Sequence, residues 1–246
     1  MTAISYALAS DEWATPRGAR LRMIRRDGTN DWNTLNASLG SNDEYGLATL
    51  NLTGWALDIG GYLGSVAIAL AVDNPGLDVI CVEPVPWNVD LIADNAKING
   101  VGDRVHLISG MVGPPGVKSA TVRHSYRGNE ALEHHAFVGN TSLTYELPGV
   151  EEHDETEVPV YSQHALNVLA GEPFAFVKID CEGGEWGWLQ DDAVRDLAHI
   201  RGEWHPVPYT GRGMTQGDLS DALGETHAVT FTGPVAGPGG FEAVRR

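Results

Sequence analysis

Short apolar runs alternate with longer segments of mixed character through most of the chain after residue 55. The runs have the length and apolar continuity of buried strands, and the segments between them carry apolar residues at helical spacing. Repeated strand–helix units of this length predict a parallel, doubly wound sheet and therefore an α/β fold. Strands are expected at residues 56–59, 78–83, 104–108, 174–180 and 199–204, and helices at 65–73, 86–98, 162–169, 185–190, 192–197 and 215–223.

The two ends of the chain depart from this alternation. Residues 1–54 are polar and mixed, with one expected strand at 21–25 and a segment, 44–52, that fits either a helix or a strand. The last two apolar runs, 228–232 and 240–244, are joined by a turn rich in Gly and Pro. That spacing predicts a terminal antiparallel hairpin.

The longest interruption follows the third predicted strand. Residues 110–172 have no strong helical period, although 119–123 and 157–161 alternate as short strands do. A stretch of this length is usually a functional insertion or a lid. We therefore expect a single domain over residues 1–246, with an N-terminal cap element at 1–54 and a lid or substrate insertion at 113–165.

A glycine-rich turn follows the first strand of the alternating region. Gly60, Gly61 and Gly64 come after the strand-ending Asp58, and glycines let a ligand approach the backbone closely. Glu83 ends the next strand, 19 residues after Gly64, where a carboxylate can accept hydrogen bonds from ribose hydroxyls. This arrangement predicts a cofactor that contains a nucleoside.

The register of the glycines narrows the choice of cofactor. A dinucleotide fingerprint has the pattern G-x-G-x-x-G, whereas this chain has D-x-G-x-x-x-G, with Tyr62 where a pyrophosphate would press. A cofactor without a pyrophosphate tolerates the tyrosine, and the carboxylate of Asp58 suits a cationic ligand. S-adenosylmethionine has both properties, because it carries an adenosine, no phosphate, a sulfonium and an ammonium.

The charge of the chain excludes one class of partner. Its 246 residues include 33 acids and 16 bases, a formal net charge of −17. This balance argues against nucleic-acid binding, which needs clustered Lys and Arg. The acidity weakly favours a cationic ligand or a basic partner, although solubility alone also accounts for it.

The remaining composition favours a protein of a reducing compartment. No apolar run approaches the roughly 18 residues of a membrane span, and residues 1–28 lack the pattern of a signal peptide. We therefore expect a cytoplasmic protein without a membrane partner. Cys81 and Cys181 lie in or beside apolar strands and are expected to be buried free thiols.

Four short segments, taken in order, resemble the motifs of the FkbM-type S-adenosylmethionine-dependent methyltransferases. They are Gly28-Thr29-Asn30-Asp31-Trp32 (an upstream G-T-x-D element), Asp58-Ile59-Gly60-Gly61-Tyr62-Leu63-Gly64 (motif I), Glu83-Pro84-Val85-Pro86-Trp87-Asn88 (an acid-proline segment) and Val177-Lys178-Ile179-Asp180-Cys181-Glu182-Gly183-Gly184-Glu185 (a K-I-D-x-E-G-x-E stretch). The resemblance covers about residues 22–112 and 172–206.

This resemblance implies a seven-stranded methyltransferase fold and methyl transfer to an oxygen, often a hydroxyl of a small metabolite in secondary metabolism. Two features depart from the family pattern. Tyr62 stands where such proteins often have Asn or His, and residues 113–165 have no counterpart that we can place.

Motifs and strand ends together give a candidate site. Contacts with S-adenosylmethionine are expected from Asp58, Gly60, Gly61, Tyr62, Gly64, Ser65, Glu83, Pro84, Asn88 and Asp180. His205 is the candidate general base, because histidine titrates near neutral pH, and Asp180, Glu182 and Glu203 are the other candidate catalytic residues. For Glu182 and Glu185, the alternative role is to stabilise a helix N-terminus with negative charge.

Several histidines of the interruption are of a type that can ligate a metal. His134 and His135, with His124 or His153 and the acids at 151–155, lack the tight spacing of a metal motif. Adjacent histidines also often point apart, and a solvated acidic loop explains these residues. We therefore expect no metal site.

Three functions remain open at this point. The first is methyl transfer from S-adenosylmethionine to a small-molecule acceptor. The second keeps the fold and the pocket, but its carboxylates bind an amine-bearing substrate and promote an intramolecular displacement or an elimination. The third is a non-catalytic subunit that binds a partner protein, or a second copy of the chain, through residues 113–165.

Overall fold

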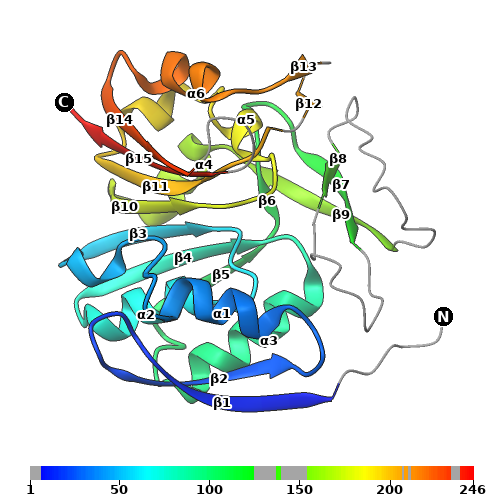
Figure 1. The fold of residues 1–246 in the computed structure, drawn as a ribbon. Helices are drawn as coiled ribbons and strands as arrows, with labels where there is room; N and C mark the ends of the chain where they lie inside the picture. Colours follow the sequence, from blue (N-terminus) through cyan, green and yellow to red (C-terminus); the bar gives the residue numbers. More distant parts are fainter. Residues whose placement is uncertain (1–6, 125–136, 140–153, 207, 210–211, 234–238) are drawn as a thin grey trace.

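A seven-stranded sheet forms the centre of the molecule, with helices packed against it (Figure 1). The computed structural model describes residues 7–124, 137–139, 154–206, 208–209, 212–233 and 239–246. In spatial order the strands are β14 (His227–Thr232), β15 (Gly239–Arg245), β11 (His199–Trp204), β10 (Phe174–Ile179), β3 (Gly54–Ile59), β4 (Leu77–Glu83) and β5 (Val105–Ser109). Among the five strands β11, β10, β3, β4 and β5, neighbours in the sheet pair in parallel. β15 pairs antiparallel with both β11 and β14. The predicted doubly wound, mostly parallel sheet and its terminal antiparallel hairpin are confirmed.

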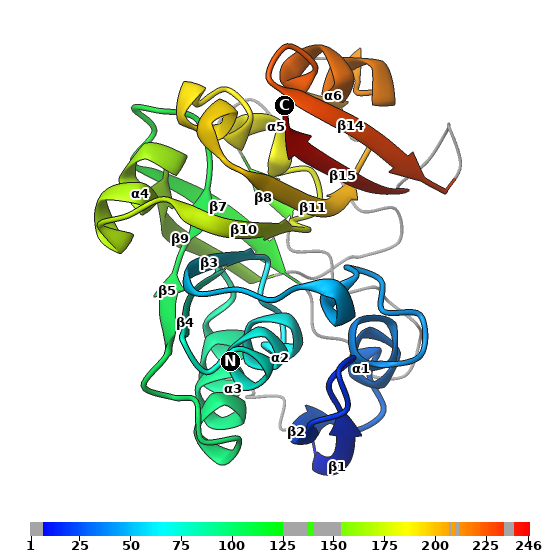
Figure 2. The same cartoon turned by 90° about the vertical axis from the view of Figure 1, so that its left-hand side faces the viewer.

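The two faces of the sheet bury two separate hydrophobic cores, because successive side chains of a strand point to opposite faces. Ala56 of β3 belongs to the core under α1 (Asp31–Leu39), α2 (Ser65–Asp73) and α3 (Pro86–Ile98). Leu57, the next residue, belongs to the core under α4 (Gln163–Ala170), α5 (Glu185–Trp188) and α6 (Gln216–Leu223). Figure 2 shows α1, α2 and α3 together on one side of β3 and β4. Burial on both faces explains the nearly continuous apolar runs of the central strands.

The N-terminal segment forms a hairpin that the sequence pattern predicts only in part. β1 (Leu8–Ala14) pairs antiparallel with β2 (Arg20–Arg26), of which only residues 21–25 were predicted. The hairpin lies along α3, where Asn95 donates to the carbonyl of Ile24 (3.0 Å) and accepts from its N–H (2.6 Å). The Asn95 side chain therefore satisfies backbone groups of β2 that a neighbouring strand would otherwise bind.

A second, four-stranded sheet stands beside the main one, in the order β6 (Met111–Val112), β9 (Asp154–Tyr161), β7 (Ser119–His124) and β8 (Phe137–Gly139). It contains both short strands that were predicted in the interruption. A small core of Val85, Met111, Ala120, Val122 and Val158 joins it to the segment after β4. Its role as a lid or substrate insertion stays a prediction.

The remaining elements are short. They are two 3-10 helices, η1 (Leu47–Thr49) and η2 (Asp192–Asp196), and the strand pair β12 (Pro208–Tyr209) and β13 (Arg212–Gly213). The segment 44–52, left open between helix and strand, therefore holds only the turn η1 in a loop. No helix in the described part of the chain is both long and apolar enough to cross a membrane.

Candidate active site

A cavity of about 500 Å³ opens at the carboxyl ends of the central strands. Its walls come from the turn after β3, the segments after β4 and β5, the turn after β10, and the end of β11. Five residues of α1 or its N-terminal boundary close one side, namely Asn30, Asn33, Thr34, Ala37 and Ser38. Ligands of open α/β sheets lie at this edge, so the cavity occupies the position where the sequence placed its candidate site.

The glycine turn is held by backbone contacts that exclude side chains. Gly60 has a φ of 79°, and a Cβ added there would overlap the carbonyl oxygen of Asp180. Asp180 donates its N–H to the carbonyl of Ile59 at 3.1 Å. The turns after β3 and β10 therefore touch backbone to backbone, which explains the need for glycine at position 60.

Asp58 lies behind the turn and not in the cavity wall. Its side chain is fully buried and accepts from the N–H of Ala67 (3.0 Å), in the first turn of α2. Its other oxygen lies 3.3 Å from Nζ of Lys178, which also donates to the carbonyls of Ile59 and Gly60. Burial alone would lower the pKa of Lys178, but Asp58 and Asp180 raise it to about 12. Asp58 and Lys178 thus form a buried ion pair that ties β10 to the glycine turn.

Glu83 ends β4 in the cavity wall, with three donors already on its carboxylate. Oε1 accepts from the N–H of Val85 (3.0 Å) and from Nδ2 of Asn88 (3.1 Å), and Oε2 accepts from the N–H of Tyr62 (2.9 Å). Burial raises the pKa of Glu83, and these three hydrogen bonds oppose that rise. A carboxylate offers roughly four lone-pair positions, so Oε2 retains capacity for one more donor.

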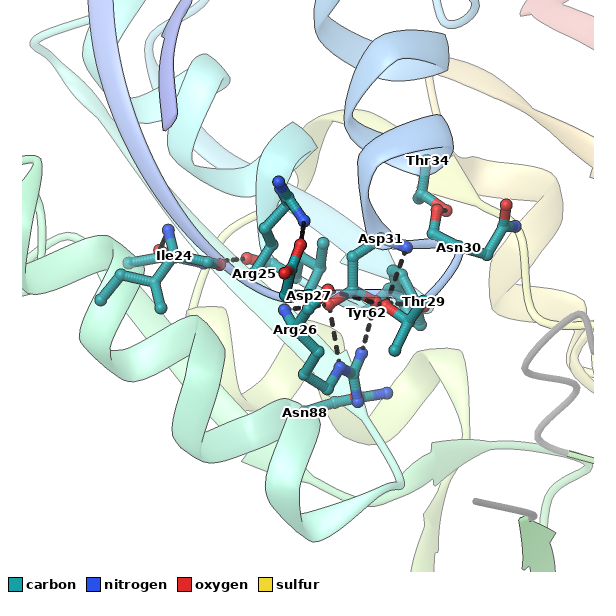
Figure 3. A network of polar contacts seen from close by, with 12 residues as sticks. Ile24, Arg25, Arg26, Asp27, Thr29, Asn30, Asp31, Thr34, Tyr62 and Asn88 are labelled. Carbon is teal, nitrogen blue, oxygen red and sulfur yellow. Dashed lines mark hydrogen bonds and ion pairs between the residues drawn. The ribbon is translucent and has the colours of Figure 1, made fainter. Parts of the chain in front are cut away.

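An ion pair from the N-terminal segment stands behind this carboxylate. Arg26, the last residue of β2, donates through Nε to Oδ2 of Asp31 (2.9 Å) and through Nη2 to Oδ1 (3.0 Å). Arg26 also donates through Nη1 to Oδ1 of Asn88 (2.9 Å), and the Tyr62 hydroxyl donates to Oδ1 of Asp31 (2.6 Å), as Figure 3 shows. Although burial alone would raise the pKa of Asp31, Arg26 and the Tyr62 hydroxyl lower it, so the carboxylate is ionised.

These contacts explain the local sequence around Asp31. Gly28 turns the chain with a φ of 74°, and the Thr29 hydroxyl donates to the carbonyl of Arg26 (3.0 Å). The same hydroxyl accepts from the N–H of Asp31 (3.2 Å) as α1 begins. The G-T-x-D element therefore builds the turn that returns Asp31 to Arg26.

Acidic groups dominate the opposite end of the cavity. Asp180 follows β10, Glu203 lies in β11, and both line the cavity with Glu182. Burial and the neighbouring charge of Asp180 raise the pKa of Glu203 to about 7. The Tyr45 hydroxyl donates to Oδ2 of Asp180 at 2.8 Å.

His205 carries a positive charge among the acids at this end of the cavity. Its Nδ1 lies 3.1 Å from Oε1 of Glu185, and its Nε2 lies 3.3 Å from Glu182 and 3.9 Å from Asp180. Burial alone would lower its pKa, but the hydrogen bond to Glu185 and the charges of Glu182 and Asp180 raise it to about 10. The imidazole therefore holds its second proton at neutral pH.

Three residues of the described chain, Asp180, Glu203 and His205, offer possible metal-ligand atoms within 4.8 Å of one another. A carboxylate–imidazole set suits divalent transition metals, but His205 would first have to lose its proton. The expectation that the protein holds no metal stays a prediction. The histidines at 134, 135 and 153 lie outside the described residues.

Both cysteines are free, Cys81 buried and Cys181 partly so. Cys181 donates to Oε2 of Glu185 (3.6 Å). Burial raises the pKa of both thiols, and the neighbouring acids raise it further. A raised pKa keeps the thiol form, which is a poor nucleophile.

Comparison with protein families matches residues 58–229 to the methyltransferase FkbM domain. The matched region contains the glycine turn, Glu83 and the acidic end of the cavity, and it spans well over half of the chain. The chain belongs to the FkbM methyltransferase family. The resemblance found in the sequence is thereby confirmed, while Arg26 and Asp31 lie before the matched residues of this FkbM chain.

Three solved structures show distant similarity to the FkbM chain. A precorrin-6Y C5,15-methyltransferase from Geobacter metallireducens is 15% identical, with 84% of this chain and 88% of that chain covered and a TM-score of 0.44. An O-methyltransferase from Bacillus cereus in complex with SAH is 15% identical, with coverages of 87% and 91% and a TM-score of 0.41. An S-adenosylmethionine-dependent methyltransferase from Agrobacterium tumefaciens is 10% identical, with coverages of 99% and 71% and a TM-score of 0.48. A search of curated proteins found no match.

Most of the sequence-predicted site residues meet at the cavity of the FkbM chain. The residues in its wall are Gly60, Gly61, Tyr62, Ser65, Glu83, Pro84, Asn88, Asp180, Glu182, Glu203 and His205. Asp58 and Gly64 stand behind the wall and support the turn and the start of α2.

Sequence reasoning missed several residues that the structure brings to the site. They are Arg26, Asp31, Glu44, Tyr45, Lys178 and the polar face of α1. The signal for Asp31 and Lys178 was present in the motifs that carried the resemblance, but nothing in their spacing indicated a common location.

Proposed function

We propose that this FkbM chain binds S-adenosylmethionine in the cavity and transfers its methyl group to a hydroxyl oxygen of a small-molecule acceptor. The observation that carries the proposal is the remaining acceptor capacity of Glu83, beside the glycine turn. A ribose hydroxyl supplies a donor of the right kind for Oε2. Family membership supports methyl transfer as the class of reaction.

The walls next to Glu83 also fit the proposed cofactor. The apolar lining residues Pro84, Val85, Trp87, Met111 and Val112 follow Glu83 or β5 and would suit contact with a purine ring. The three cations that line the described part of this cavity are each held by an acid, Arg26 by Asp31, Lys178 by Asp58 and His205 by Glu185. A pyrophosphate would therefore find no uncommitted positive charge in the described wall, whereas a cofactor without phosphate needs none.

The acidic end of the cavity supplies a group that can take the acceptor's proton. When bound, S-adenosylmethionine supplies a methyl group on a sulfonium, an electrophile that needs alignment more than activation. Glu203 has a pKa of about 7, so its carboxylate form is present at neutral pH and accepts the hydroxyl proton as the oxygen reacts.

The proton-accepting role therefore passes from His205 to Glu203 in our proposal. His205 is already protonated at neutral pH, because Glu185, Glu182 and Asp180 raise its pKa to about 10. Its positive charge favours the ionised form of Glu203. A role in secondary metabolism and a cytoplasmic location stay predictions.

Calorimetric titration with S-adenosylhomocysteine tests the proposed cofactor. Glu83→Gln replaces one carboxylate oxygen, which now accepts hydrogen bonds, with an amide NH₂ that can only donate. Because a hydrogen bond to a charged group is worth about 1.5–3 kcal/mol, we expect the affinity for S-adenosylhomocysteine to fall by roughly 100-fold. Glu172→Gln is the matched control, because Glu172 is exposed and precedes β10 at the opposite end of the strand. Absence of binding to the unmodified protein at millimolar ligand would contradict the proposal.

A further inference from the structure

Five residues close a ring of hydrogen bonds behind the cofactor wall. Arg26 binds Asp31, Asp31 accepts from Tyr62, Tyr62 donates to Glu83, Glu83 accepts from Asn88, and Asn88 accepts from Arg26. The ring joins the end of β2, the start of α1, the glycine turn, the end of β4 and the first turn of α3. Arg26, Asp31, Glu83 and Asn88 are all less than 6% exposed, so water competes little for these bonds.

From this ring we infer that Arg26 and Asp31 are positioning residues for the cofactor, which act through Asn88 and Tyr62 to fix the orientation of the Glu83 carboxylate. The inference rests on the proposed binding of S-adenosylmethionine. It extends the cofactor site into the N-terminal hairpin, which lies before the residues matched by the family.

The first route from the ion pair to Glu83 runs through the side-chain amide of Asn88, whose two ends have different partners. The side-chain amide of Asn88 has an acceptor end and a donor end of nearly equal shape. Arg26 has only donors, and its Nη1 lies 2.9 Å from Oδ1 of Asn88. This contact leaves Nδ2 as the end that faces Glu83, at 3.1 Å. Arg26 thereby reinforces the orientation in which Asn88 presents a donor to the carboxylate and holds the amide in place.

The second route runs through the backbone of Tyr62. This residue has a φ of 50°, a left-handed conformation that is unfavourable for a side chain with a Cβ. Its hydroxyl donates to Asp31, and the Arg26 guanidinium carbon lies 5.2 Å from the centre of its ring. Both contacts hold the ring, and the same backbone conformation aims the Tyr62 N–H at Oε2 of Glu83.

The two routes end on different oxygens of Glu83. Asn88 donates to Oε1 and Tyr62 donates to Oε2, the oxygen that keeps capacity for the ribose. A carboxylate fixed at both oxygens has lost its torsional freedom before the ligand arrives. Preorganisation of this kind raises affinity, because the cost of ordering is not incurred on binding.

Two nearly isosteric substitutions test the inference by titration with S-adenosylhomocysteine and by thermal unfolding without ligand. Tyr62→Phe removes only the hydroxyl, and we expect about tenfold weaker binding. Asn88→Asp keeps an acceptor for Arg26 but replaces the donor toward Glu83 with an oxygen, and we expect binding to weaken by roughly 100-fold. Neither substitution leaves Arg26 or Asp31 without its partner, so both variants should fold.

Asn99→Asp is the matched control for the second variant. Asn99 follows α3 and holds the same hairpin through Arg22, whose N–H it accepts (2.9 Å) and to whose carbonyl it donates (2.7 Å). It has no place in the ring, so Asn99→Asp should lower the unfolding temperature and leave the affinity within about twofold, the size of ordinary context effects.

The outcomes separate this inference from the proposed function. Failure of the unmodified protein to bind would overturn both. Binding by the unmodified protein, with equal affinity in Tyr62→Phe and Asn88→Asp, would overturn the positioning role alone. The positioning role is also overturned if Asn99→Asp weakens binding as much as Asn88→Asp, because the ring would then act only through docking of the hairpin.

Discussion

Replacing Lys178 with methionine should destabilise the whole fold, although the residue lies in the wall of the cavity. Its ammonium is 3.3 Å from Asp58 and donates to the carbonyls of Ile59 and Gly60 at 3.2 and 2.8 Å. Methionine keeps the length and apolar character of the stem but removes the charge and all three contacts. Burial raises the pKa of Asp58 and Lys178 opposes that rise, so the substitution would leave a fully buried acid without its cation.

The size of the effect follows from that burial. Removing one partner of a buried ion pair costs about 3–5 kcal/mol, because the remaining charge is desolvated without compensation. For a chain of this size, 1 kcal/mol corresponds to roughly 2–4 °C in the unfolding temperature. We therefore expect Lys178→Met to unfold roughly 6–20 °C below the unmodified protein.

Urea unfolding followed by far-UV circular dichroism, together with a thermal scan, measures the loss. Lys118→Met is the matched control, since Lys118 is exposed, and it should leave both transitions nearly unchanged. The double variant Lys178→Met with Asp58→Asn removes the orphaned charge and should recover part of the stability. A Lys178→Met protein as stable as the unmodified one would refute the assignment of this pair as a buried structural bridge.

Three further predictions follow from individual contacts. The folded-state pKa of Glu203, about 7, lies above its ordinary value near 4.5, so the folded protein binds more protons than the unfolded chain between those pH values. The free energy of unfolding should therefore fall as the pH rises from about 4.5 to about 7. Urea titrations at several pH values should show a flatter slope for Glu203→Gln, and an unchanged slope would contradict the raised pKa. Gly60→Ala should prevent normal folding or lower the unfolding temperature strongly, because its Cβ would overlap the carbonyl of Asp180. The control Gly100→Ala also has a positive φ (71°) but open space around the site, so it should cost only about 1 kcal/mol. Equal shifts in the unfolding temperature would contradict the clash. Thr215→Ala removes a capping box at the start of α6 and should cost about 1 kcal/mol in urea unfolding, an effect that Thr215→Ser should largely spare.

The sequence predicted the alternating core well, because its strands are buried on both faces and its helices end at clear signals. The helix predicted at 65–73 occupies those same residues, and the next begins at Pro86 and ends just before Asn99 and Gly100. The N-terminal segment was harder to interpret. α1 buries only Leu35 and Leu39 among its apolar side chains, so it has almost no periodic hydrophobic signal.

Candidate site residues were predicted where a motif ended a strand, and missed where contacts form across the fold. Glu83, Asp180 and Glu203 follow from their positions at strand ends. The pairing of Arg26 with Asp31 depends on the turn between them, and its link to Asn88 crosses 62 positions of sequence. The protonation of His205 could not be deduced either, since it depends on Glu185 and Glu182 from another turn.

The backbone contact between the two turns has a consequence for how the protein can change. Asp180 donates its N–H to the carbonyl of Ile59, and Gly60 leaves no room for any other spacing between them. The distance from the glycine turn to the acidic end of the cavity is thus set by main-chain atoms, which a new side chain at position 181 leaves in place. Under the proposed function, a new side chain there would change which acceptor is recognised and leave the binding position of the methyl donor unchanged, so the two halves of the site are free to diverge separately.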